Sequence, residues 1–131
     1  MNFENYFEAT YQYVLENITY NRLPETADSF EITLLDTMKF TLLQNDLHVL
    51  VERNLSIQPK CLFELKVAYG ILLHFKDGCS VQHTDEEWLE FFSKNDNPYT
   101  SLVMSRISLV ISQITAANGQ QPLVTPPQFQ Q

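Results

Sequence analysis

The residues most able to do chemistry in this chain are its two cysteines and three histidines. Cys79 and His83 lie four positions apart, and Cys61 and His74 precede them, so these four side chains offer the ligands that zinc prefers. Structural zinc sites usually bring their ligands as tight pairs, and this spacing matches no such module. We therefore expect no metal, and we interpret the cysteines as small buried hydrophobic side chains that stay reduced.

Motifs that mark common enzyme sites are missing from the sequence. It contains no glycine-rich phosphate loop, no G-x-S-x-G nucleophile turn and no H-E-x-x-H metal motif. The most concentrated carboxylates, Asp85, Glu86 and Glu87, follow a threonine, and the start of a helix explains them because negative charge is favourable there. The sequence predicts neither catalysis nor a cofactor.

The charge of the chain is acidic, with 8 Lys and Arg against 16 Asp and Glu and a formal net charge of −8. Such a chain repels nucleic-acid phosphates and anionic membranes, so we expect no nucleic-acid binding. It has no run of eighteen apolar residues, and its beginning, MNFENYFEAT, lacks the plan of a signal peptide. These features predict a cytoplasmic protein without membrane insertion, folded as one domain over residues 1–131.

Apolar residues alternate with polar ones over the first 76 residues, which is the pattern of half-buried strands. The phase slips near Glu16 and Asn17, which predicts a bulge in the first strand. Three further alternating runs follow, separated by short polar turns. Four long strands with short connections predict an antiparallel sheet over about residues 6–76.

The pattern changes to helical periodicity after residue 78. Thr84 and Glu87 form a capping box, which predicts a short helix over residues 85–94 that buries Trp88, Leu89 and Phe92. Asn or Asp followed by Pro98 predicts a second helix over residues 98–117, and the NG pair after it supplies a stop. The expected fold class is α+β.

The second predicted helix is apolar around much of its circumference, whereas a helix packed on one sheet needs a single apolar stripe. The excess indicates a second contact, most simply with another copy of the chain, and we expect a dimer or a tetramer. The residues predicted for this contact are Val103, Arg106, Ile107, Val110 and Ile114.

The end of the chain is an uncharged arm at residues 119–131, and no charged residue follows Arg106. From that arginine the sequence reads RISLVISQITAANGQQPLVTPPQF, and near the start it reads YVLENITYNRLP over residues 13–24. Both stretches resemble the corresponding ends of the SecB family of protein-export chaperones and their SecB-like relatives. The order of elements, four antiparallel strands and then helices, is similar to that fold.

The resemblance implies a tetramer built from two dimers, with long apolar grooves that hold unfolded polypeptide without ATP. It implies unfolded or partly folded clients as partners, together with the export ATPase or an antitoxin. Because proline disfavours regular helix, the arm would lie extended over the sheet as one wall of a groove. The residues predicted to line the groove are Tyr20, Leu23, Phe30, Leu123, Val124 and Phe129.

Two other functions remain open at this stage. The chain could be an adaptor or structural module with the same fold and one specific protein partner. It could also bind a small hydrophobic ligand, because clefts lined by aromatic side chains accept lipids as well as peptides.

Overall fold

The computed structural model describes residues 3–80 and 82–131. A 3-10 turn at Phe3–Tyr6 leads into four strands, which are followed by two helices and an extended C-terminal arm. The strands are β1 (Phe7–Arg22), β2 (Glu31–Leu43), β3 (Asp46–Gln58) and β4 (Phe63–Phe75), and the helices are α1 (Asp85–Phe92) and α2 (Pro98–Ala117). The predicted fold class, an α+β chain with a four-stranded antiparallel sheet, is confirmed.

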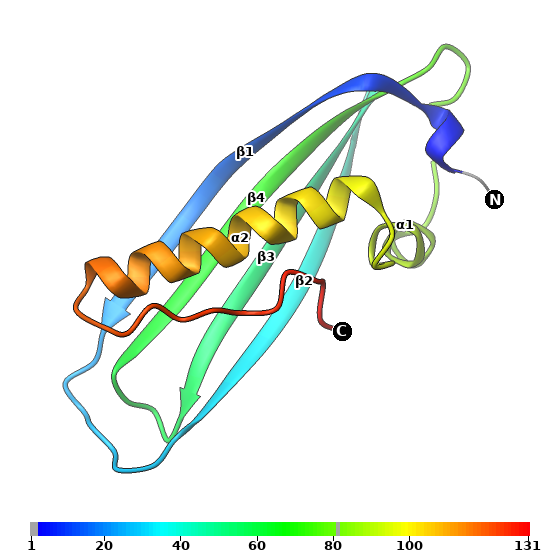
Figure 1. Ribbon diagram of the computed structural model, residues 1–131. Coiled ribbons are helices and arrows are strands. Elements are labelled where there is room, and N and C mark those ends of the chain that lie inside the picture. The colour runs from blue at the N-terminus through cyan, green and yellow to red at the C-terminus, as the bar shows by residue number, and fades with distance from the viewer. Residues whose placement is uncertain (1–2, 81) are drawn as a thin grey trace.

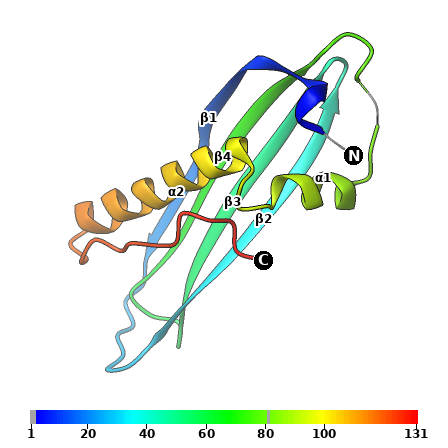
Figure 2. The same ribbon diagram turned by 45° about the vertical axis from the view of Figure 1, so that its right-hand side comes forward.

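The strands form one sheet in the order β1-β4-β3-β2, and all three pairings are antiparallel. Both helices and the arm lie on the same face of this sheet, which we call the helix-side face (Figures 1 and 2). Helix α2 crosses the sheet, and the arm runs back beside it over β3 toward β2. In the described part of the chain, neither helix nor the arm lies on the opposite face. The molecule therefore has two layers, with its core between the sheet and α2.

Alternate side chains of the two central strands, β3 and β4, fill that core. On β3 and β4 every second side chain is buried, which is the pattern expected of strands whose one face packs on a helix. The helices contribute side chains that are completely or almost completely buried: Trp88, Phe92, Val103, Met104, Ile107 and Ile111. Helix α2 is long and apolar enough to cross a membrane by length and composition alone, and its packing on the sheet accounts for the part of that apolarity that is buried.

The predicted bulge in β1 is present, because the register with β4 shifts between Leu15 and Asn17. The carboxyl group of Glu16 lies over Gly70 of β4, where an added Cβ would stand 2.6 Å from it. From there it reaches His48 Nε2 on β3 at 3.0 Å. The bulge thus explains why a glycine is needed in the middle of β4.

The capping box at the start of α1 is present as predicted. Thr84 Oγ1 accepts a hydrogen bond from the Glu87 amide at 3.2 Å, and Glu87 Oε1 accepts one from the Thr84 amide at 3.0 Å. The helix ends at Phe92, two residues before the predicted end. Asn97 explains the early stop: its Nδ2 donates to the Phe91 carbonyl, and its Oδ1 accepts from the first amides of α2.

Candidate functional site

The helix-side face leaves two apolar flanks uncovered. On β1 the exposed side chains are Tyr13, Leu15 and Ile18, and each pairs with a buried residue of β4. Along the other edge of the same face, the exposed side chains are Ile32 and Leu42 of β2 and Phe30 just before that strand. All six are between 39% and 42% exposed. We call these sets the β1 flank and the β2 flank; α2 and the arm lie between β1 and β2 (Figure 1).

A buried ion pair lies at the centre of the helix-side face. Arg53 of β3 and Asp36 of β2 are paired across the sheet, and both side chains are completely buried. Arg53 Nε donates to Asp36 Oδ1 at 2.8 Å and Nη2 donates to Oδ2 at 2.7 Å. This two-pronged geometry fixes the guanidinium plane, so that its remaining N–H groups have defined directions.

Those remaining N–H groups hold the arm. Arg53 Nη1 donates to Thr125 Oγ1 at 2.9 Å and to the Pro126 carbonyl at 2.6 Å, and Nη2 donates to the Gln128 carbonyl at 2.9 Å. Asp36 Oδ2 in turn accepts the Gln130 amide at 2.8 Å. All five guanidinium N–H donors are used, two by the carboxylate and three by the arm.

Helix α2 holds the first part of the arm through two hydroxyl groups. Ser108 Oγ donates to the Thr125 carbonyl at 2.7 Å, and Thr115 Oγ1 accepts the Leu123 amide at 2.9 Å. Of the six hydrogen bonds that join residues 123–130 to Arg53, Asp36, Ser108 and Thr115, five use main-chain groups of the arm. The arm is thus held largely without regard to its side chains.

The structure places the six predicted groove residues at different depths. Tyr20, Leu23 and Leu123 are half-buried, Phe30 and Val124 are exposed, and Phe129 is buried. Tyr20 stacks on Phe63 with ring centroids 5.5 Å apart, and its hydroxyl is buried with no hydrogen-bond partner among the described residues. Tyr20, Leu123 and Phe129 all pack on the same core cluster. Phe129 is therefore an anchor of the arm, and Val124, 82% exposed, points away from the body.

The residues predicted for a contact between copies also divide. Val103 and Ile107 are completely buried against the sheet of their own chain. Val110 and Ile114 are half-buried, and Arg106 is exposed on the side of α2 that also carries exposed Leu109. A second chain would meet this outer side of α2, not the buried one.

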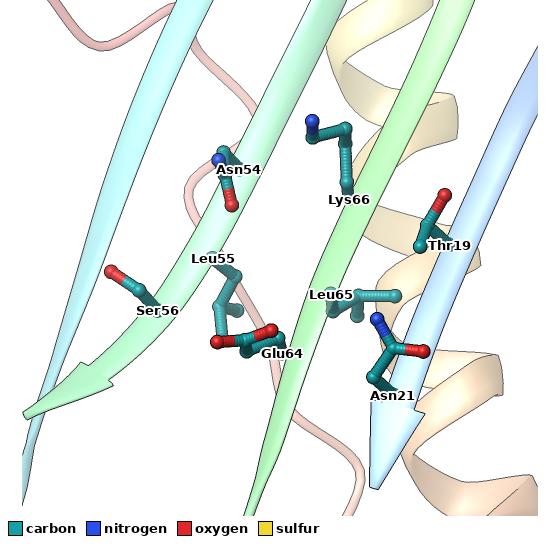
Figure 3. Close-up of a pocket in the computed structure, with 8 residues that line it drawn as sticks. All are labelled: Thr19, Asn21, Asn54, Leu55, Ser56, Glu64, Leu65 and Lys66. Atoms are coloured by element: carbon teal, nitrogen blue, oxygen red, sulfur yellow. The ribbon is translucent and has the colours of Figure 1, made fainter. Parts of the chain in front are cut away.

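The opposite face of the sheet carries polar groups together with the exposed apolar side chains Val14, Leu35 and Leu43. A shallow pocket of about 300 Å³ lies between β1, β3 and β4. In Figure 3 it is seen with α2 and the arm behind the sheet, and its lining includes Thr19, Asn54, Ser56 and Lys66. The same face carries hydrogen bonds between Glu16 and His48 and between Asp46 and His74, at 3.0 and 2.7 Å.

The cysteines and histidines considered as zinc ligands do not form one cluster in the described part of the chain. Cys61 is buried in the core, and His74 pairs with Asp46 on the opposite face. Among the residues that the structure describes, no group of three or more His, Cys, Asp or Glu side chains is placed to hold a metal ion.

Sequence reasoning missed the Arg53–Asp36 pair, although a signal for it was present. Asp36 interrupts the run Ile32, Leu34, Met38, Phe40 and Leu42, which shares one strand parity. Arg53 interrupts the matching run of β3 between Val51 and Leu55. A charge at a core position of a strand needs a buried partner, and two opposite charges on neighbouring strands would have supplied one.

Comparisons with known proteins bear on the fold. No family model matches the chain, and no curated protein matches it by sequence. Among solved structures, the chain is similar to a SecB-like chaperone of Mycobacterium tuberculosis in complex with a ChAD peptide from the HigA1 antitoxin. The TM-score is 0.66 with 15% identity, and the match covers 90% of each chain. The chain therefore has a SecB-like fold.

Proposed function

We propose that this protein is an ATP-independent chaperone that holds unfolded or partly folded polypeptide on the helix-side face of its sheet. The observation that carries the proposal is the pair of apolar flanks on that face. Six large apolar side chains stay exposed on either side of α2 and the arm, in a chain whose fold is that of a SecB-like chaperone.

Physical chemistry favours this use of the flanks. A surface that holds unfolded chains needs many weak apolar contacts with little preference for sequence. Burying about 1,000 Å² of apolar surface gives on the order of 25 kcal/mol before the client is ordered, so even partial coverage of the flanks supports useful binding. The net charge of −8 keeps such a surface soluble and favours clients with basic segments.

The proposed setting is the cytoplasm, with the chain acting as a dimer or tetramer. Exposed Leu109 on the outer side of α2, together with Val110 and Ile114, which the core covers only in part, supports a contact between copies. The proposed partners are client proteins, and the export ATPase is a further candidate. Light scattering at micromolar concentration tests the assembly, and a monomer would remove that part of the proposal.

Suppression of aggregation tests the function. A chemically unfolded protein is diluted into buffer with and without this chain, with no nucleotide present, and light scattering is followed. We expect suppression at near-stoichiometric amounts. Absence of suppression by a folded sample would contradict the proposal.

Two matched double variants on β2 locate the surface. Ile32→Ser with Leu42→Ser removes exposed apolar groups from the helix-side face, where these residues pair with buried Ile57 and Leu47. Leu35→Ser with Leu43→Ser removes two exposed groups of the same strand from the opposite face. The first variant should weaken suppression several-fold, and the second should leave it unchanged. Equal effects would contradict a binding surface on the helix-side face.

A dedicated adaptor with one protein partner is the second candidate. It is favoured by the structural neighbour, which was solved in complex with a peptide from one antitoxin. An adaptor would give one dominant partner in a pull-down and weak suppression of unrelated aggregating proteins. A general chaperone would give many partners and broad suppression.

A further inference from the structure

The centre of the helix-side face needs an occupant. If the arm left, three N–H donors of Arg53 would lose their acceptors and Asp36 would lose the Gln130 amide. The pair, now buried, would then be open to water and to any other polypeptide group that offers a carbonyl or an amide. The arm thus occupies the pair as a bound ligand would.

The arm shows which ligand chemistry fits this site. Its main-chain contacts to the ion pair come from residues 126, 128 and 130, around a bend at residues 127–128. The carbonyls of Pro126 and Gln128 face Arg53, and the amide of Gln130 faces Asp36. Between them Phe129 turns its ring into the core and is only 8% exposed. The site therefore binds main-chain carbonyl and amide groups together with one large apolar side chain.

Burial along the arm indicates that it can be replaced. Within residues 119–131 only Thr125 and Phe129 are buried, and the rest are half-buried or exposed. Helix α2, in contrast, buries four large apolar side chains completely. Release of the arm would therefore remove few of its own apolar side chains from the core, chiefly Phe129 and half-buried Leu123.

We propose that Arg53 and Asp36 form a main-chain-binding site for a polypeptide segment without regular secondary structure, and that the arm is an internal occupant which a client segment displaces. This inference rests on the proposed function, because it names how a client reaches the centre of the face between the two flanks. The arm competes as part of the same chain, at an effective concentration on the order of millimolar, so it blocks weak ligands and admits strong ones.

A labelled peptide with the arm's own sequence tests the site. The probe is fluorescein-labelled PLVTPPQFQQ, identical to residues 122–131, and its binding to the full-length chain is followed by fluorescence polarisation. The chain variant Phe129→Ala loosens the internal arm and leaves Arg53 and Asp36 intact. We expect it to bind the peptide at least tenfold more tightly than the unchanged chain does. Thr125→Ala, which removes one acceptor from the arm, should shift affinity in the same direction by less.

Two controls establish where the peptide binds. A probe in which the phenylalanine is replaced by serine should bind at least tenfold more weakly to the Phe129→Ala chain. Adding Arg53→Met with Asp36→Leu to that chain replaces the buried pair by apolar groups, a kind of exchange that often preserves folding. The resulting triple variant, checked by circular dichroism, should lose the gain in affinity.

The outcomes separate this inference from the proposed function. Equal peptide affinity for the unchanged chain and for both arm variants would overturn the main-chain site, as would undiminished binding by a folded triple variant. If suppression of aggregation persisted in that case, the proposed function would stand on the flanks alone. Peptide exchange without any suppression would keep the site and remove the chaperone role.

Discussion

Helix α2 and the arm cover the same face of the same sheet, but different forces hold them there. Helix α2 is held by completely buried apolar side chains, among them Val103, Ile107 and Ile111. The arm is held by one aromatic ring and by main-chain hydrogen bonds, most of which end on a buried ion pair. One cover is part of the core, and the other lies on it as a ligand would.

This difference assigns a role to each cover. The close packing of many apolar side chains stabilises the fold. A client segment of different sequence could not reproduce that packing, so α2 is not replaceable. Hydrogen bonds to main-chain groups can be transferred to any extended polypeptide, since every residue carries the same carbonyl. A chaperone needs both kinds of cover, because it must stay folded while it exchanges ligands of unrelated sequence.

The largest effect should come from breaking the ion pair beneath the arm. Arg53→Met leaves the Asp36 carboxylate buried without its partner, and we expect a loss of about 3–5 kcal/mol in the free energy of unfolding. The double variant with Asp36→Leu should recover most of that loss. Urea denaturation measures both, and a double variant as unstable as the single one would show that the pair also stabilises the fold through the arm.

Shortening one side chain of α2 should come next. Ile107→Ala removes a completely buried side chain, which should lower the free energy of unfolding by about 2–5 kcal/mol. Leu109→Ala, on the exposed side of the same helix, is the control and should change it by less than about 0.5 kcal/mol. Similar losses for the two variants would mean that α2 is not the fixed cover.

The corresponding change in the arm should cost less. Phe129→Ala removes a larger buried side chain than Ile107→Ala does, yet we expect a loss below about 2 kcal/mol. The arm can detach locally, so the loss is limited to its own docking free energy. Hydrogen exchange should show lost protection at the amides of Leu123 and Gln130 with α2 unchanged. A global loss as large as that of Ile107→Ala would make the arm part of the core.

The smallest effect concerns α1, which borders the two covers. Thr84→Ala should cost about 1 kcal/mol through loss of the helix cap, as measured by urea denaturation. The hydrogen bond from the Thr84 amide, followed by that from its hydroxyl, lowers the pKa of Glu87 in the folded chain.

The pH dependence of this contribution has a defined sign. Because the folded pKa of Glu87 lies below the unfolded one, the contribution is complete above the ordinary glutamate value of about 4.3. It is lost as the pH falls through the lowered folded value. The stability difference between the unchanged chain and Glu87→Gln should therefore shrink only in acid, and a difference that shrinks near neutral pH would contradict this assignment.

The sequence predicted the elements well because each carries a local signal. Alternation marked the four strands, Thr84 with Glu87 marked the start of α1, and Pro98 marked that of α2. Resemblance at the two ends of the chain predicted the SecB-like fold, which the structural comparison supports. Local patterns sufficed because these elements depend mainly on neighbouring residues.

The candidate site was harder to predict because it depends on contacts between distant residues. Arg53 and Thr125 are 72 positions apart, and only the folded chain brings the arm over β3. Phe129 was predicted as a groove wall, since sequence cannot tell an aromatic anchor that points inward from one that faces a client. The only advance indication was that Asp36 and Arg53 each place a charge at an otherwise apolar alternate position of a strand.

Hydrogen exchange of the full-length chain with a bound client tests the central claim most directly. The client is a permanently unfolded protein with its cysteines reduced and alkylated, added in saturating amounts, and exchange is read by mass spectrometry. We predict faster exchange in residues 119–131 and unchanged exchange in α2, because the client takes the place of the arm and leaves the fixed cover intact. An arm that keeps its full protection while the client is bound would contradict the account.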